Sequence, residues 1–377
     1  MFNHLIIFLF ALLQLLLCNS WANRLEIDIF KRDVKVKDDE IWQNESIVLY
    51  KTMNKEYYGI MKIGSPAQEF KMYFDTTWVD SWVPSQHCGI LEVACLLHKR
   101  YDSSLSSSYI EDGTLFKASV NGLEGFYSID IFHLPHLELK NQMFIEITHM
   151  SARSYLSDIA DGVIGMAFEN SSYTKAVPFF KNLQNQNLVK EPIFTLYMNR
   201  DETTNKAGKL ILGATDRKHA KGKLTVVNVT DNVFWKFDIN LITVSSFNKS
   251  HLFCKGGCSA IIDSSSSIIN GPANETEQIN NLLKARKLKV GPFERYMVDC
   301  RQYAKLQDVV FQIGGEPFTL KSKYYVQHMN YYGFEICLSP FASHNNTYWL
   351  IGGAFLMQFY SEFNIKEKTI AFAQTIV

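Results

Sequence analysis

The chain has 377 residues, with 38 lysines and arginines against 38 aspartates and glutamates, so its formal net charge is zero. A neutral chain without basic runs or interleaved aromatic residues has no general attraction to nucleic-acid phosphates or anionic lipid, so we expect neither nucleic acid nor a membrane as partner. The length and the 47% hydrophobic fraction suffice for two globular domains of ordinary size.

The N-terminal segment is predicted to be a signal peptide over residues 1–22. Residues 5–17 are almost wholly apolar, and Ser20 and Ala22 place small residues where a signal peptidase cleaves. An uncleaved membrane anchor is the alternative, but the apolar stretch is short for a spanning helix. Residues 23–45 have mixed charge and little periodicity, which indicates a possible short pro-segment. We therefore expect a secreted, extracellular protein, with a lysosomal one as the alternative.

Six cysteines follow the predicted signal peptide, as secretion favours. Their spacing favours three local disulfides, which are Cys88 with Cys95, Cys254 with Cys258, and Cys300 with Cys337. A zinc site at Cys254 and Cys258 is the alternative, but no second close cysteine or histidine pair accompanies them. N-glycosylation sequons also fit the secretory route; they lie at Asn44, Asn170, Asn228, Asn248, Asn274 and Asn345.

From about Val48 the sequence is rich in predicted strands. Short β-branched and aromatic runs alternate with Gly, Asn, Asp and Ser, as in residues 57–64. Only a few segments look helical, the best being 174–189 and 275–287, the second with Asn274 as a possible N-cap. This pattern is typical of a mainly β fold with sandwich or barrel-like lobes rather than a doubly wound sheet.

One sequence pattern occurs twice. Residues 73–77 (YFDTT) and 261–265 (IIDSS) each place an aspartate and hydroxyl residues after an apolar strand. An apolar run ending in glycine follows each, with Gly165 90 positions after Asp75 and Gly352 89 positions after Asp263. The matched spacing predicts two similar β-rich lobes, residues 46–215 and 216–377.

An aspartate at a strand end in each of two similar lobes predicts a pair of facing carboxylates. Two carboxylates at hydrogen-bond distance share a proton, so one can take a proton from water while the other donates to a carbonyl oxygen. The hydroxyls of Thr76 and Ser264 are expected to hold the loops by hydrogen bonds to the opposite lobe. For either motif alone, an ordinary turn in which the aspartate bonds nearby backbone is the alternative.

The chain resembles the pepsin-like (A1) aspartic proteases, with a cathepsin D-like pattern, over nearly all of residues 48–377. The segments that carry the resemblance to the family's two signatures and its FDGILGLA element are 74–77, 81–85, 161–167, 254–263 and 271–272. The resemblance implies a bilobal pepsin-like fold with few short helices, Asp75 and Asp263 as the catalytic pair, and a peptide or protein substrate or ligand in the cleft between the lobes. We expect a monomer without cofactor or metal.

Departures from the family pattern surround both aspartates. The family triplet is Asp-Thr-Gly, but Thr77 and Ser265 replace the two glycines, and glycine permits the closest backbone approach. Trp78 stands where the family has a serine that hydrogen-bonds the first aspartate. The flap hairpin over 116–125 is two residues short and places Val120 at the family's tyrosine position. The residues expected in the cleft and flap are Val120, Gly122 and Trp82, with Thr76, Thr77, Ser264 and Ser265 supporting the dyad.

These changes predict weak or absent proteolysis and a cleft that binds peptides or other ligands, as the resemblance to degenerate arthropod (allergen-type) members of the family implies. The alternative is an active acid endopeptidase. A third hypothesis is a Mg²⁺ site at Asp263, Ser265 and Ser267, but that site needs a helix after the strand, and a strand-like segment follows instead. His133 and His136 are a possible metal pair, for which surface histidines beside Pro135 are the simpler interpretation.

Overall fold

The computed structural model describes residues 45–51, 56–118, 122–151, 155, 158–168, 176–199, 206–246, 249–290, 293–331 and 334–376. The predicted signal peptide over 1–22 lies outside these residues. The predicted pro-segment over 23–45 does too, except for Glu45, where the first strand begins. Both segments therefore stay predictions. No helix in the described ranges is long and apolar enough to span a bilayer.

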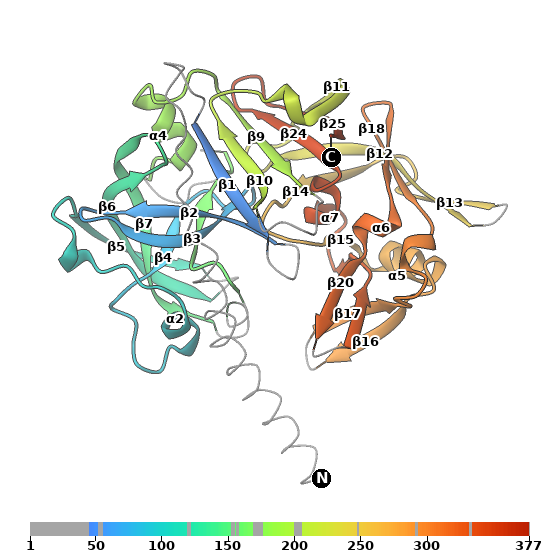
Figure 1. Ribbon diagram of the computed structural model, residues 1–377, viewed down its shortest axis with the longest axis horizontal. Helices are drawn as coiled ribbons and strands as arrows, with labels where there is room; N and C mark the ends of the chain where they lie inside the picture. The colour runs from blue at the N-terminus through green and yellow to red at the C-terminus, as the bar shows by residue number, and fades with distance from the viewer. Residues whose placement is uncertain are drawn as a thin grey trace, which may run out of the picture. The chain divides into compact units, whose positions relative to one another are not determined.

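Most of the described chain forms β-sheet, which confirms the predicted fold class of two β-rich lobes with few short helices. The largest sheet has 13 strands in the order β11-β25-β24-β9-β10-β1-β2-β3-β8-β4-β7-β6-β5 (Figure 1). In chain order their bounds are β1 Glu45–Lys51, β2 Tyr57–Ile63, β3 Gln68–Asp75, β4 Trp82–Pro84, β5 Ile110–Ala118, β6 Leu123–His133, β7 Glu138–Met150, β8 Gly162–Gly165, β9 Ile193–Met198, β10 Lys206–Leu212, β11 Ala220–Asn228, β24 Phe359–Asn364 and β25 Thr369–Thr375.

Two further sheets belong to the second half of the chain. The first follows the order β19-β18-β12-β14-β23-β15-β22, with β13 paired to β12, and the second the order β16-β17-β21-β20. Their bounds are β12 Lys236–Ser246, β13 Lys249–Phe253, β14 Cys258–Ile262, β15 Ile269–Pro272, β16 Arg286–Val290, β17 Phe293–Val298, β18 Val309–Ile313, β19 Glu316–Leu320, β20 Gln327–Tyr331, β21 Phe334–Leu338, β22 Phe341–His344 and β23 Trp349–Ile351.

The described helices are short. They are α2 Val93–Leu97, α4 Phe179–Asn185, α5 Ala273–Leu282, α6 Ser322–Tyr325 and α7 Gly353–Leu356, with 3₁₀ turns η1 Ser103–Leu105, η3 Arg217–His219 and η4 Tyr303–Lys305. The expected cap at Asn274 was wrong, because Pro272 precedes the helix with φ −55° and Asn274 lies in its first turn. The expected end of this helix at residue 287 was also wrong. Lys284 has a positive φ of 56°, which ends the helix, and β16 begins at Arg286.

The sequence repeat corresponds to a repeated arrangement of strands. In the first half β3 runs parallel to β8, and β8 pairs antiparallel with β4. In the second half β14 runs parallel to β23, and β23 pairs antiparallel with β15. Each aspartate therefore ends or follows the first strand of such a unit, at the point where the chain leaves the sheet.

Glycine closes each unit because the backbones approach too closely for a side chain. A Cβ at Gly165 would lie 2.0 Å from the carbonyl oxygen of Val79, and one at Gly352 would lie 2.2 Å from that of Ile268. Contacts this short do not occur in folded proteins, so both glycines are required for packing. They hold the end of β8 or β23 against the loop that follows the aspartate.

The two predicted lobes share strands and core. Strand β24 from the end of the chain pairs with β9, and Figure 1 shows the two side by side. Phe194 of β9 stacks on Phe363 of β24 with centroids 4.6 Å apart, and Trp235 packs edge-on against both rings. The exact division of the lobes at residue 215 stays a prediction, since the largest sheet contains strands from both sides of it.

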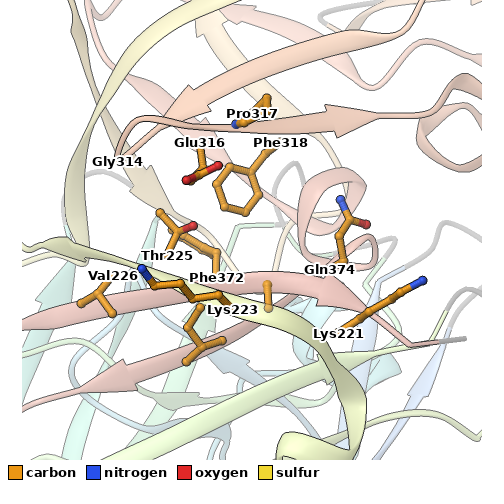
Figure 2. Close-up of a pocket in the computed structure, with 12 residues that line it drawn as sticks. Lys221, Lys223, Thr225, Val226, Gly314, Glu316, Pro317, Phe318, Phe372 and Gln374 are labelled. Atoms are coloured by element: carbon orange, nitrogen blue, oxygen red, sulfur yellow. The ribbon is translucent and has the colours of Figure 1, made fainter.

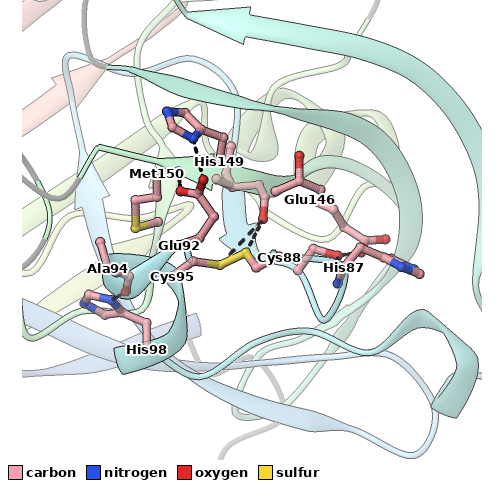
Figure 3. The surroundings of a disulfide bond; sticks show 12 residues. His87, Cys88, Glu92, Ala94, Cys95, His98, Glu146, His149 and Met150 are labelled. Atoms are coloured by element: carbon pink, nitrogen blue, oxygen red, sulfur yellow. Dashed lines mark hydrogen bonds and ion pairs between the residues drawn. A yellow bond between two sulfur atoms is a disulfide. The ribbon is translucent and has the colours of Figure 1, made fainter. Parts of the chain in front are cut away.

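Three disulfides are formed, and they join the local pairs that the spacing favours: Cys88–Cys95, Cys254–Cys258 and Cys300–Cys337. Figure 3 shows the first, which closes the loop carrying α2. Glu92 ties this loop to β7 through His149, with 2.8 Å between Oε1 and Nδ1. His98 at the end of α2 contacts the carbonyl oxygen of Asp158 through Nε2 at 3.0 Å. The loop that carries Asp158 is thereby fixed to the disulfide loop.

Candidate active site

The loops after β3 and β14 meet and exchange buried hydrogen bonds. Thr76 Oγ1 donates to the carbonyl oxygen of Ile262 at 2.7 Å and accepts from the backbone N–H of Ser264 at 3.1 Å. Ser264 Oγ donates to the carbonyl oxygen of Phe74 at 2.5 Å and accepts from the N–H of Thr76 at 3.0 Å. This near-symmetric set fixes the two loops to each other, and so fixes the distance between the aspartates that they carry.

Asp75 is held firmly by its own loop. Its Oδ1 accepts two hydrogen bonds from Thr77, one from the backbone N–H at 2.7 Å and one from Oγ1 at 2.6 Å. The sequence indicated that a polar donor would be missing here, because Trp78 replaces a serine. The Thr77 hydroxyl supplies a donor to the same carboxylate, so Asp75 keeps its support from a different residue.

Ser265 links the two carboxylates. Its Oγ lies 2.9 Å from Oδ2 of Asp75 and 3.0 Å from Oδ1 of Asp263. One hydroxyl has one proton to donate, so both contacts are satisfied together when one carboxylate is ionised and the other is protonated. The bridging hydroxyl therefore fits a dyad that shares a single proton.

Loss of hydration favours the protonated forms of both aspartates, and repulsion by Asp75 adds to it at Asp263. Loss of hydration raises the pKa of Asp75, and hydrogen bonds from Thr77, Ser265 and the Trp78 backbone lower it in part. Loss of hydration raises the pKa of Asp263, and the charge of Asp75 raises it further. The pair consequently keeps a proton at pH values where ordinary aspartates have lost theirs.

A pocket of about 240 Å³ opens beside Asp75 and Ser265. Its wall is mostly aromatic and acidic, and the other residues that line it are Glu56, Tyr73, Trp78, Trp82, Tyr155, Asp158, Ala160, Gly162 and Val163. Trp82 packs edge-on against Trp78 (centroids 6.4 Å apart) and Tyr155 (5.6 Å). Of the residues predicted for the cleft, Trp82 is thus beside the dyad.

The other predicted cleft residues are Gly122 and Val120, which the sequence assigns to a flap hairpin. Gly122 adopts a positive φ of 64° at the start of β6, and its carbonyl oxygen accepts a hydrogen bond from the Ser151 N–H at 3.1 Å. Val120 lies outside the described residues. The roles of both in the cleft stay predictions.

Two acidic residues of the pocket were missed by the sequence reasoning. Glu56 precedes β2, and its Oε2 accepts a hydrogen bond from the Tyr73 hydroxyl at 3.0 Å. Burial, together with the charge of Asp158, raises the pKa of Glu56 to about 7. Burial also raises the pKa of Asp158 to about 6. No motif marks either residue, because their proximity to Asp75 depends on how the chain folds.

Potential metal ligands in the described part of the chain are engaged in other bonds. The group of potential ligands there is Cys300, His328 and Cys337, and its two sulfurs are joined in a disulfide. Ser267, considered as a Mg²⁺ ligand, is buried and its Oγ accepts a hydrogen bond from Gln327 at 2.7 Å. Its neighbour Ser265 is engaged by the carboxylates, and β15 follows rather than a helix.

A larger cavity of about 590 Å³ lies apart from the aspartates. Figure 2 shows it between β11, β25 and the β18–β19 hairpin, with the side chains of Lys221, Lys223, Glu316, Phe318 and Phe372 around it. Neither Asp75 nor Asp263 lines this cavity, so size alone does not identify the site of chemistry.

Comparison with known proteins shows similarity along most of the chain. Residues 56–375, which include both aspartates, match the family model for eukaryotic aspartyl protease. Cathepsin D of Gallus gallus is 36% identical over 336 residues, which cover 87% of this chain and 83% of that protein. Cathepsin D of Canis lupus familiaris is 34% identical over 338 residues (85% and 81%), and that of Homo sapiens 32% over 345 residues (87% and 82%).

Proposed function

Because this chain belongs to the eukaryotic aspartyl protease family, we propose that it is a secreted homologue of these peptidases that binds peptides in its cleft and cleaves them weakly or not at all. Asp75 and Asp263 are the proposed dyad, supported by Thr76, Thr77, Ser264 and Ser265. The predicted signal peptide and the three disulfides support a secretory route, which leads either outside the cell or to the lysosome.

The position of the Ser265 hydroxyl is the observation that carries this proposal. Hydrolysis by two carboxylates needs a water within hydrogen-bond distance of both, so that one carboxylate takes its proton while the other protonates the carbonyl oxygen. Ser265 Oγ already bonds to both carboxylates, at 2.9 and 3.0 Å. A side chain in this position competes with the water and crowds the carbonyl group that the water attacks. This competition concerns the water alone, so the proposal keeps both the fold and a cleft that binds peptides.

An active acid endopeptidase is the second candidate, and one observation favours it. Both carboxylates are retained and joined through one hydroxyl, with Asp75 buried and Asp263 half-buried, and their raised pKa values fit a pair that holds a single proton at acidic to neutral pH. If Ser265 turns its hydroxyl away when a substrate enters, the carboxylates can activate water as in the rest of the family.

A proteolysis assay separates the two candidates. The mature protein is incubated with denatured haemoglobin at pH 3.5, 4.5 and 5.5, with and without a pepstatin-like inhibitor, beside the Asp75→Asn variant. The proposal predicts cleavage indistinguishable from that of Asp75→Asn, or lower than that of an active family member by about 10²-fold or more. Robust cleavage that the inhibitor and Asp75→Asn both abolish would establish the second candidate instead.

A further inference from the structure

We propose that the pocket beside Asp75 selects a cationic side chain, a lysine or an arginine, of the peptide in the cleft. This inference rests on the proposed function, since it names the class of peptide that the site takes. It is argued from the chemistry of the pocket wall, from a polar group left without a partner, and from the size of the pocket.

Two carboxylates stand in the wall in addition to the dyad. Glu56 reaches the pocket from the segment before β2, and Asp158 reaches it from the loop before β8. The Tyr73 hydroxyl donates to Glu56 at 3.0 Å, and His98 contacts the backbone carbonyl of Asp158, so both residues are fixed in place. Fixed carboxylates in a partly desolvated pocket bind ammonium or guanidinium groups through charge-assisted hydrogen bonds.

Aromatic rings form much of the remaining wall. Trp82 makes T-shaped contacts with Trp78 and with Tyr155, and all three rings line the pocket. A cation is attracted to the negative face of an aromatic ring, most strongly to that of tryptophan. Carboxylates and tryptophan rings that line one pocket attract the same kind of group, a positively charged side chain with an apolar stem.

Trp82 provides an independent indication of a ligand. Its side chain is buried (4% exposed), it lines the pocket, and its Nε1 has no hydrogen-bond partner among the described residues. A buried donor without an acceptor costs about 1–3 kcal/mol, so an incoming acceptor is favoured. A peptide carbonyl oxygen is such an acceptor, and it reaches the shielded Nε1 when the pocket wall shifts on binding.

The size of the pocket favours a single side chain. Sites for whole small-molecule ligands run from about 300 to 1,000 Å³. The volume of about 240 Å³ lies below that range, and Asp75 and Ser265 form part of the wall. A side chain in the pocket therefore places its peptide backbone next to the dyad.

Protonation links this selectivity to pH. The pKa of Glu56 is raised to about 7 and that of Asp158 to about 6, so both are largely neutral below these values in the empty pocket. A bound cation stabilises the ionised forms and releases protons. The other groups that interact with Glu56 are Tyr73 and Arg295, and those that interact with Asp158 are Tyr73, Tyr155 and His98. Arg295 lowers the pKa of Glu56, and His98 lowers that of Asp158.

The test measures binding of two peptides that differ at one side chain, lysine in one and norleucine in the other. Norleucine keeps the apolar stem and lacks the charge. Calorimetric titrations use the Asp263→Asn variant, which prevents turnover, at pH 5.0 and 7.5. At pH 7.5 we expect the lysine peptide to bind at least about tenfold more tightly, and we expect the ratio to shrink at pH 5.0.

Matched variants locate the effect. Glu56→Gln with Asp158→Asn, in the same background, is expected to remove the preference, whereas Glu69→Gln, an exposed carboxylate on β3, is expected to keep it. The Asp263→Asn protein with Glu56 and Asp158 unchanged is also titrated with the lysine peptide at pH 6.5, in buffers that differ in ionisation enthalpy. We expect the measured heat to change with the buffer, which shows that binding releases protons. This second measurement does not depend on the folding of the pocket variants.

The outcomes distinguish this inference from the function on which it rests. Equal binding of both peptides, without proton release, overturns the inference and leaves the peptide-binding cleft intact. Binding of neither peptide at either pH contradicts the proposed function, and the inference with it.

Discussion

Around the two aspartates, the hydroxyls of Thr76, Thr77, Ser264 and Ser265 make hydrogen bonds that their positions in the sequence only partly indicate. Ser264, in place of the family's threonine, still exchanges two hydrogen bonds with Thr76 across the lobes. Thr77 supplies a donor to Asp75. Both Thr77 and Ser265 have φ outside the left-handed region, so neither replacement of glycine strains the backbone. The substitutions therefore change what lies between the carboxylates and leave the loops intact.

At the residue scale, the sequence predicted which residues come together better than how they contact one another. The duplicated motif identified Asp75 and Asp263, and their hydroxyl neighbours identified the interlobe contacts. The bridge through Ser265 could not be predicted, because it depends on the rotamer of one side chain and on the closeness of two loops 190 positions apart. Glu56 and Asp158 carry no motif, and only the folded chain places them beside Asp75.

At the element scale, the decisive feature is the pair of three-strand units that end at Gly165 and Gly352. Each glycine lets a strand end pass against the loop that follows an aspartate. Strand β3 pairs with β8, and β14 pairs with β23. These four strands are the apolar runs that the sequence shows before each aspartate and each glycine. The ends of α5 were less predictable. Pro272 sets its start, and the positive φ of Lys284 sets its end.

Replacing Gly165 with alanine is expected to destabilise the fold severely. The new Cβ would lie 2.0 Å from the carbonyl oxygen of Val79, which is backbone and cannot move aside without breaking the unit. We expect a loss of about 3 kcal/mol or more in the free energy of unfolding, measured by urea denaturation with disulfides intact. Gly89→Ala is the matched control, because its nearest neighbour, Cγ of Glu92, is 3.8 Å away. Equal stability of the two variants would show that this close approach is not required.

At the scale of the whole molecule, the fold brings several carboxylates into one partly buried region. Burial holds the pKa of Glu56 at about 7, against an ordinary value of 4.5, and that of Asp158 at about 6, against 3.8. Between the ordinary and the raised pKa values, the folded protein therefore binds more protons than the unfolded chain. The stabilisation from these protons is complete below about pH 4 and is lost as pH rises through 6 and 7.

This linkage predicts a stability that falls toward neutral pH. Each shifted carboxyl contributes up to about 3 kcal/mol, from about 1.4 kcal/mol for each pKa unit. Unfolding midpoints in urea, measured for the native chain between pH 4.5 and 8, are expected to decrease with pH. The Glu56→Gln/Asp158→Asn variant, whose amides do not titrate, is expected to show a flatter profile. Parallel profiles for the two proteins would mean that these groups do not control the pH dependence.

The central claim is that a serine hydroxyl between Asp75 and Asp263 suppresses proteolysis, and the most direct measurement restores both glycines. Turnover of a denatured protein substrate at pH 4.5 is compared for the native chain, Thr77→Gly/Ser265→Gly and Ser104→Gly. Ser104 is the control because its exposed hydroxyl also donates to an aspartate, Asp102, at 2.6 Å. We predict that the double variant gains inhibitor-sensitive turnover by about tenfold or more while Ser104→Gly gains none. A native chain that already cleaves as fast as the double variant would contradict the claim.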